Sequence, residues 1–189
     1  LSSKEIEKLE AKLESTYPCI SAAQLNKLRQ LYYEGLIFES LSMSRRLVLQ
    51  FPNDQNIVNT LGVINSSAKQ YFEAITFYTR AIKLNPRFVK AYYNLGNLLV
   101  ELSKHCDAIV NYRKAVILEP KLVECYFNLA NSLSKSKRYH QAISNYQKTL
   151  YLQPDYAVVH NNLGHSLKCL GDSDGAIKAY TDAMEIKPD

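Results

Sequence analysis

Apolar residues recur along the chain three and four positions apart, which is the period of one face of an α-helix. Residues 74–84 are an example, because their larger apolar side chains fall at Ile75, Tyr78 and Ile82. Prolines close such stretches, and a proline cannot continue a helix and biases the residue before it away from helical geometry. The pattern predicts short helices joined in pairs by turns.

The prolines set a strict period along the chain. They stand 34 residues apart, at Pro18, Pro52, Pro86, Pro120, Pro154 and Pro188. A fixed period in this range is typical of stacked repeat proteins. Counting back from each proline predicts four repeats, over residues 55–88, 89–122, 123–156 and 157–189.

Other residue types keep the same period. Position seven of each repeat is Leu, position eight is small, position twenty is Ala and position twenty-four is Tyr. In order, these residues are Leu61, Leu95, Leu129 and Leu163; Gly62, Gly96, Ala130 and Gly164; Ala74, Ala108, Ala142 and Ala176; and Tyr78, Tyr112, Tyr146 and Tyr180. Small residues let two helix backbones approach closely, and Leu and Tyr fill the remaining space.

Residues 21–54 resemble a degenerate copy of the same unit. The segment Ser21–Gln24 has the form of a capping box at a helix start. Gly35 falls where the turn between the two helices is expected, while Ser40 and Ser44 replace the usual Ala and Tyr. We expect a terminal repeat to deviate in this way, because one of its sides faces water.

Residues 1–20 carry apolar residues on one side of a segment rich in Lys and Glu. We interpret them as an N-terminal amphipathic capping helix, with the remnant of another repeat as the alternative. The chain stops where the last repeat ends, without a further helix to cover it. Because solenoids need polar caps, we expect the sequence to be part of a longer protein.

The repeat pattern resembles the tetratricopeptide repeat over residues 55–188, with Ala, Tyr, Ala and Pro recurring in the second helix. The resemblance implies an all-α fold, a right-handed α-solenoid of antiparallel helix pairs. It also implies that the first helix of each pair lines an inner groove, and that the protein is a protein-interaction scaffold, superhelical in shape. An enzymatic activity of these residues is not expected.

Composition and charge exclude other classes of protein. Hydrophobic residues make up 47% and charged residues 22%, as in globular proteins. No apolar run exceeds four residues, so no membrane partner is expected, and no export signal is visible. Four cysteines without a Cys-x-x-Cys pair favour reduced thiols and a cytoplasmic location. A net charge of +5 is well short of what nucleic-acid binding proteins carry, so no nucleic-acid partner is expected.

No catalytic, metal-binding or cofactor-binding pattern is found. The chain lacks glycine-rich phosphate loops, and its histidines do not have metal-ligand spacing. Asp172–Gly175 has the composition of a calcium-loop fragment, but we interpret it as a cap and turn. His160 stands where other repeats have Tyr, which predicts a packing role, and His165 is expected at the surface. No cofactor and no metal are therefore predicted.

Asparagines recur on the face of the first helices that the resemblance assigns to the inner groove. Positions six and nine carry most of them, position five adds Tyr93, Phe127 and Asn161, and position two adds Lys90. The predicted peptide-binding residues are Asn94, Asn97, Asn128, Asn131, Asn162, Tyr93, Phe127, Asn161 and Lys90. An Asn amide both donates and accepts hydrogen bonds, so such a ladder suits an extended peptide backbone. The alternative is that these asparagines bridge neighbouring helices and bind no ligand.

The ladder resembles that in the repeats of O-linked N-acetylglucosamine transferase, where asparagines hold extended protein substrates. A second binding mode of the family, the carboxylate clamp of chaperone adaptors, is not expected because its basic residues are missing. Three hypotheses follow: a peptide-binding scaffold, the substrate-recruiting arm of a larger enzyme such as a glycosyltransferase or sulfotransferase, and end-to-end self-association of two copies.

Overall fold

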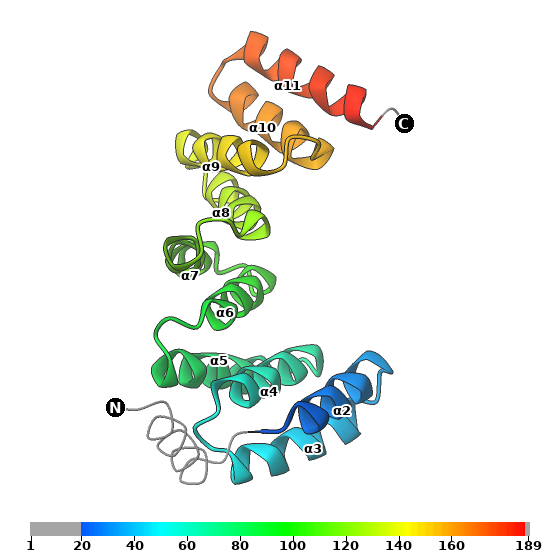
Figure 1. Cartoon of the computed structure of the whole chain (residues 1–189). Coiled ribbons are helices and arrows are strands. Elements are labelled where there is room, and N and C mark those ends of the chain that lie inside the picture. The colour runs from blue at the N-terminus through cyan, green and yellow to red at the C-terminus, as the bar shows by residue number, and fades with distance from the viewer. Residues whose placement is uncertain (1–19, 188–189) are drawn as a thin grey trace, which may run out of the picture. The chain divides into compact units, whose positions relative to one another are not determined.

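Ten α-helices follow one another along residues 20–187, which are the residues that the computed structural model describes (Figure 1). None of these residues lies in a β-strand. The predicted all-α helical-repeat solenoid is therefore confirmed. Residues 1–19, which hold nearly all of the predicted capping helix, lie outside the described part. The chain divides into two units, residues 1–88 and 89–189.

The first unit contains four described helices, which pack in chain order: α2 on α3, α3 on α4, and α4 on α5. They are α2 (Ala22–Tyr33), α3 (Ile37–Gln50), α4 (Gln55–Ser67) and α5 (Tyr71–Leu84). The core of this unit contains Leu28, Ile57 and Ile64, whose side chains are completely buried. Burying side chains of this size contributes about 1.5–3 kcal/mol each to folding.

The second unit contains six helices, which are α6 (Val89–Glu101), α7 (His105–Leu118), α8 (Val123–Lys135), α9 (Tyr139–Leu152), α10 (Ala157–Cys169) and α11 (Ser173–Ile186). Consecutive helices pack on one another throughout this unit. In addition, α6 contacts α8, and α8 contacts α10. The first helix of each pair therefore belongs to one row within the second unit. The repeat boundaries drawn from the sequence stay a prediction.

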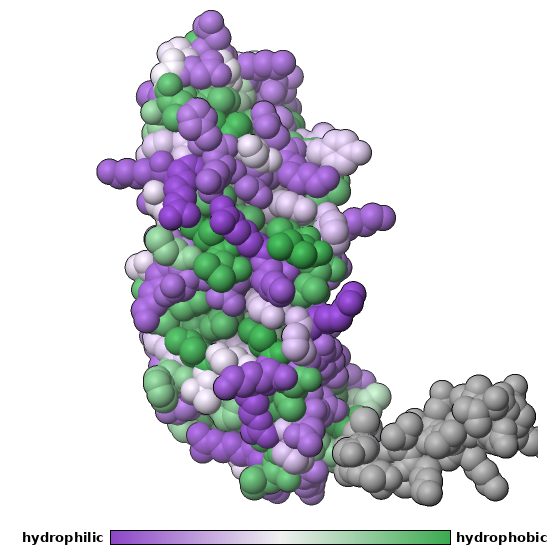
Figure 2. Space-filling view, turned by 90° about the vertical axis from the view of Figure 1, so that its left-hand side faces the viewer, coloured by the Kyte–Doolittle hydropathy of each residue, from purple (hydrophilic) through white to green (hydrophobic). Residues whose placement is uncertain are grey.

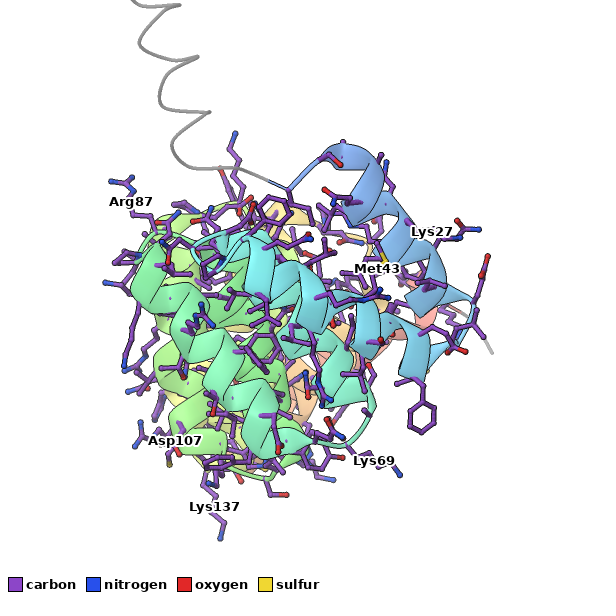
Figure 3. The ribbon with its side chains drawn as sticks, turned by 90° about the horizontal axis from the view of Figure 1, so that it is seen from below. Lys27, Met43, Lys69, Arg87, Asp107 and Lys137 are labelled. Atoms are coloured by element: carbon purple, nitrogen blue, oxygen red, sulfur yellow. The ribbon has the colours of Figure 1, made fainter. Side chains whose placement is uncertain are left out.

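The turn inside each helix pair uses one left-handed residue. Gly35 and Gly171 have φ angles of 77° and 83°, while Lys69, Ser103 and Lys137 have φ angles of 58–59°. After α4, the Gln70 N–H donates to the Asn65 carbonyl over 2.8 Å, and the other turns repeat this bond. This is the Schellman arrangement, which satisfies carbonyls left over at a helix end. In the first unit it directs the Lys69 side chain away from the helices (Figure 3).

Small residues and tyrosines pack as predicted inside the helix pairs. A Cβ atom added to Gly96 would lie 2.6 Å from the ring of Tyr112, and one added to Gly62 would lie 2.7 Å from Tyr78. Ala130, at the corresponding position beside Tyr146, is completely buried. Close contact between the two helices of a pair therefore depends on a side chain no larger than a methyl group at this position.

Several local predictions are confirmed. Ser21 and Gln24 form the predicted capping box at the start of α2. Ser40 and Ser44 are buried, and their hydroxyls donate to the carbonyls of Ile37 and Leu41. Each serine thus satisfies its polar atom within its own helix, which lets it occupy a position where other pairs have Ala or Tyr.

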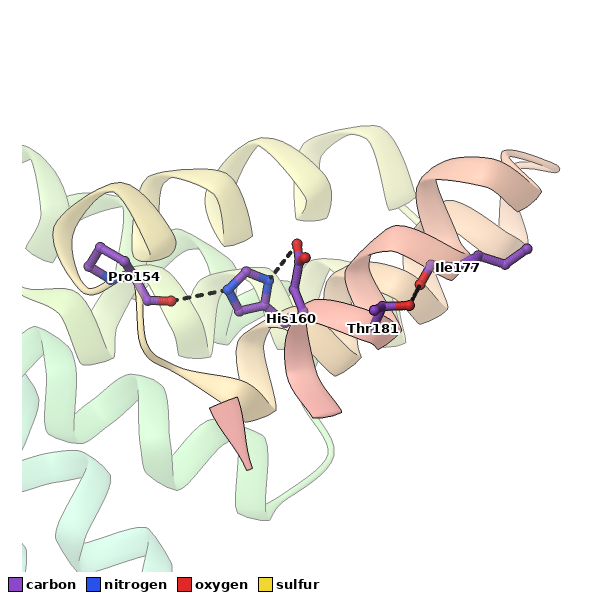
Figure 4. A network of polar contacts seen from close by, with 5 residues as sticks. Pro154, His160, Ile177 and Thr181 are labelled. Atoms are coloured by element: carbon purple, nitrogen blue, oxygen red, sulfur yellow. Dashed lines mark hydrogen bonds and ion pairs between the residues drawn. The ribbon is translucent and has the colours of Figure 1, made fainter. Parts of the chain in front are cut away.

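The C-terminal helix pair confirms two further interpretations. Asp172 caps α11 by accepting a 2.9 Å hydrogen bond from the Gly175 N–H, as expected of a turn residue. His160 is 15% exposed and donates through Nε2 to the Pro154 carbonyl over 3.0 Å, while its Nδ1 lies 3.7 Å from an oxygen of Asp182 (Figure 4). His160 therefore packs between the turn before α10 and helix α11.

The surface mixes residue types. In Figure 2, hydrophilic and hydrophobic residues are interspersed over the visible face, and no broad apolar surface is seen in that view. Within residues 20–187, no helix is both long enough and apolar enough to cross a membrane.

Candidate functional site

A cavity of about 770 Å³ lies in the second unit, along the row formed by α6, α8 and α10. Asparagines, serines and tyrosine rings make up most of its wall, and charged side chains from the turns complete it. The lining residues are Asn97, Val100, Glu101, His105, Tyr112, Asn128, Asn131, Ser132, Ser134, Lys135, Lys137, Tyr139, Tyr146, Asn162 and His165. Most of the lining residues are therefore polar or aromatic.

A hydrogen-bond network joins helices α6, α7 and α8 at this cavity. The side-chain oxygen of Asn97 accepts a 2.6 Å hydrogen bond from the Tyr112 hydroxyl and a 3.1 Å hydrogen bond from Nδ2 of Asn128. Nδ2 of Asn128 also lies 3.4 Å from the Tyr93 hydroxyl. One amide oxygen thus receives donors from two other helices, which holds the amide in one orientation.

The same network recurs 34 residues later, among helices α8, α9 and α10. The side-chain oxygen of Asn131 accepts a 2.7 Å hydrogen bond from the Tyr146 hydroxyl and a 3.0 Å hydrogen bond from Nδ2 of Asn162. These four asparagines therefore bridge neighbouring helices, as one part of the alternative interpretation supposed. Whether they also bind a ligand depends on which of their amide atoms have no hydrogen-bond partner in the network.

Burial determines the ionisation of the two network tyrosines. Tyr112 and Tyr146 are each 1% exposed. Burial raises the pKa of both phenols well above the ordinary value of about 10, because the phenolate would lose its hydration. Both hydroxyls therefore stay protonated at neutral pH and serve as donors to the asparagines.

Each asparagine keeps part of its hydrogen-bonding capacity free. Among residues 20–187, Nδ2 of Asn97 and of Asn131 has no hydrogen-bond partner, and neither has the side-chain oxygen of Asn128 and of Asn162. All four side chains are partly exposed. The cavity therefore presents two amide donors and two amide acceptors whose orientations are set by bonds behind them.

The residues at the network positions differ in the first unit and in α10. In the first unit, the position of Asn97 is taken by Val63, which cannot form hydrogen bonds, and the Thr60 hydroxyl donates to the Asn56 carbonyl of its own helix. In α10, the same position is His165, which is exposed and lines the cavity. The two amide pairs described above therefore lie on α6, α8 and α10.

The nine predicted site residues differ from one another in their position relative to the cavity. Asn97, Asn128, Asn131 and Asn162 line the cavity, and Tyr93 contacts Asn128 but is not itself a lining residue. The remaining four, which are Asn94, Phe127, Asn161 and Lys90, are not among the lining residues. Asn94 is half-buried, Phe127 packs on the ring of Tyr156 with centroids 5.2 Å apart, and Asn161 and Lys90 are exposed.

Sequence reasoning missed two groups of lining residues. Tyr112 and Tyr146 were expected only to fill space, yet their hydroxyls reach the amides. The recurrence of Tyr rather than Phe at that position was an available signal, since a buried hydroxyl needs a partner. The second group is Lys135, Lys137 and Tyr139, from the turn region between α8 and α9. No periodic pattern marks these residues.

Other site chemistry is limited. Within residues 20–187, no group of three or more His, Cys, Asp or Glu side chains is placed to hold a metal ion. The buried Cys125 thiol donates weakly to the Tyr112 carbonyl over 3.5 Å, and burial raises the pKa of this thiol to about 12. Cys125 is therefore a packing residue in the folded protein.

Solved structures share this fold. A structure of MamA is 20% identical, covering 84% of this chain and 92% of that one, with a TM-score of 0.79. MamA residues 41-end from Desulfovibrio magneticus RS-1 is 21% identical, covering 87% and 93%, with a TM-score of 0.80. YrrB, described as a TPR protein with an unusual peptide-binding site, is 18% identical, covering 95% and 92%, with a TM-score of 0.78. None of the curated proteins compared matches this chain.

Family models account for most of the chain. The model described as the tetratricopeptide repeat protein 21 C-terminal ARM domain matches residues 58–163, which is more than half of the chain. A model described as tetratricopeptide repeat matches residues 157–189. Together with the helix pairs and the glycine–tyrosine packing, these matches identify the fold family. The chain belongs to the tetratricopeptide-repeat family, through the tetratricopeptide repeat protein 21 C-terminal ARM domain over residues 58–163 and a further repeat after it.

Proposed function

We propose that the second unit binds an extended peptide segment of a partner protein in the cavity along α6, α8 and α10. The observation that carries this proposal is the set of free amide groups in the cavity. Asn97 and Asn131 each offer a donor, and Asn128 and Asn162 each offer an acceptor. A peptide backbone in extended form presents N–H and C=O groups that such amides can bond, whatever the side chains are.

Preorganisation supports a binding role for these amides. Because each amide is already held by a hydrogen bond from a neighbouring helix, little side-chain entropy is lost when a ligand binds it. Partly exposed aromatic rings beside the amides, such as Tyr139, offer apolar contact area to the ligand. YrrB has a similar fold and is described as having a peptide-binding site, which is consistent with this role.

The test compares asparagines of the cavity with asparagines of the outer helices. Short random peptides displayed in a library are selected on the intact protein, and the selected peptides are synthesised with a fluorophore. In fluorescence polarisation, the double variant Asn128→Ala with Asn162→Ala should weaken binding about tenfold, since each lost amide contact contributes roughly 0.5–1.5 kcal/mol.

The matched control is Asn111→Ala with Asn145→Ala. Both of these amides donate to carbonyls of their own helices, α7 and α9, and neither lines the cavity. The control should retain the affinity of the original protein. Circular dichroism of both variants separates loss of binding from loss of folding. Equal affinity of the two double variants in the folded state would contradict the proposal.

The other functional hypotheses stay predictions. A role as the substrate-recruiting arm of a larger glycosyltransferase or sulfotransferase would use the same peptide-binding cavity. End-to-end self-association and the absence of nucleic-acid binding rest on sequence reasoning alone. Static light scattering measures the first of these directly, because a monomeric mass would contradict self-association.

A further inference from the structure

A thiol and two groups that can exchange protons lie beside one another next to the cavity. The Sγ atom of Cys169, on the last turn of α10, lies 3.7 Å from Nε2 of His165 one turn earlier. The hydroxyl of Tyr139, at the start of α9, interacts with the same thiol, and this contact raises the pKa of Tyr139. His165 and Tyr139 both line the cavity, whereas Cys169 is exposed beside them.

The other described cysteines differ from this arrangement. Cys125 is buried and holds its proton. Cys106 is exposed in the first turn of α7, and within residues 20–187 no imidazole forms a hydrogen bond with its thiol. Among the described thiols, only that of Cys169 has an imidazole within hydrogen-bonding distance, so faster reaction of Cys169 would come from its neighbours.

We propose that Cys169 is a covalent modification site that forms mixed disulfides with low-molecular-weight disulfides, with His165 as its base. His165 Nε2 takes the proton from Sγ, and the thiolate attacks one sulfur of the incoming disulfide. The disulfide of the reagent breaks while a new S–S bond to Cys169 forms. The departing thiolate then takes the proton from the imidazolium, so Cys169 is oxidised and half of the reagent is reduced.

The position of Cys169 gives this modification a consequence for the groove, which rests on the proposed function. An adduct on Sγ would lie beside His165 and Tyr139, which both line the cavity. A group as large as glutathione would occupy space that an extended peptide needs. Modification of Cys169 should therefore lower the affinity for peptide, and reduction should restore it.

The test uses oxidised glutathione as the disulfide and the full chain as the protein. Peptide mass spectrometry after quenching follows the mixed disulfide at each cysteine separately. We expect Cys169 to react faster than Cys106, and His165→Gln to slow Cys169 about tenfold while the rate at Cys106 stays unchanged. The control His140→Gln, at an exposed histidine on α9, should change neither rate.

Equal rates at Cys169 and Cys106, or an unchanged Cys169 rate in His165→Gln, would overturn the proposal. Circular dichroism checks that His165→Gln remains folded. The peptide arm measures the affinity of a selected peptide before and after glutathione addition, with Cys169→Ser as the unreactive control. Unchanged affinity of the modified protein would overturn the link to the groove. The rate comparison needs no peptide, so it remains decisive even if the proposed function fails.

Discussion

At the scale of single residues, the tyrosines of the network combine two roles. Tyr112 fills the space over Gly96, and its hydroxyl holds the amide of Asn97. The Tyr146 hydroxyl holds the amide of Asn131 in the same way. A phenylalanine could take the first role but would leave the amide less constrained. Position twenty-four therefore connects the core of each helix pair to the cavity.

The raised pKa values of Tyr112 and Tyr146 predict a loss of stability in alkaline solution. Both phenols are protonated in the folded and unfolded states below pH of about 10, so their contribution is complete there. Above that pH the unfolded chain releases these protons first, and the free energy of unfolding falls by about 1.4 kcal/mol per pH unit for each tyrosine. Urea unfolding at increasing pH measures this slope.

The matching variant is Tyr112→Phe with Tyr146→Phe. It should be less stable at neutral pH, because two amide oxygens each lose a donor, and its stability should fall less steeply above pH of about 10. Tyr151→Phe is the control, since that ring is 78% exposed. A slope that is the same in the double variant and in the original protein would refute the assignment to these two phenols.

At the scale of elements, the turn between paired helices sets the direction of the second helix. Five turns place one residue in the left-handed region, but only Gly35 and Gly171 do so without the steric cost that a Cβ atom brings. Lys69, Ser103 and Lys137 adopt the conformation because the hydrogen bonds around the turn compensate for its cost. Three of the five turns are therefore open to stabilisation.

Ser103→Gly should raise the free energy of unfolding by about 0.5–1 kcal/mol. Glycine removes the steric cost of the left-handed conformation, and the larger conformational entropy of glycine in the unfolded chain offsets only part of this gain. Gly171→Ala should lower the free energy of unfolding by a similar amount. Urea titration followed by circular dichroism measures both. If Ser103→Gly were as destabilising as Gly171→Ala, strain in the turn would not be the governing factor.

At the scale of the molecule, the two units differ in what they present to a partner. The second unit contains the amide network, whereas the first has Val63 and Thr60 at the corresponding places. Both units share the same helix pairs and turns. The proposed binding function therefore belongs to one unit, and the repeat fold by itself does not confer it.

A selected peptide should protect the second unit and not the first. Hydrogen exchange followed by mass spectrometry should slow in α6, α8 and α10, because binding suppresses their local opening. Exchange in α2 should stay the same, which provides the comparison within one molecule. Equal protection of both units would contradict a binding site confined to the second.

The fold was largely predictable from the sequence, because repetition makes local signals reinforce one another. Helices α4, α6, α8 and α10 begin at Gln55, Val89, Val123 and Ala157, which keep the spacing of 34 residues. The prolines, the glycine–tyrosine pairs and the capping box each depend on neighbours within one helix pair, so spacing along the chain is enough to identify them. The candidate site was predictable only in part: four of its asparagines follow from helical periodicity.

The sequence by itself determined the period, the helix pairs, the small residues at their contacts and the face that carries the asparagines. Only the tertiary structure decided how those asparagines are used, because the bonds Asn128–Asn97 and Asn162–Asn131 join residues 31 positions apart on different helices. The same holds for Cys169, whose neighbour Tyr139 comes from another helix pair. Periodicity specifies the direction of a side chain from its own helix, whereas its partners depend on how helices pack against one another.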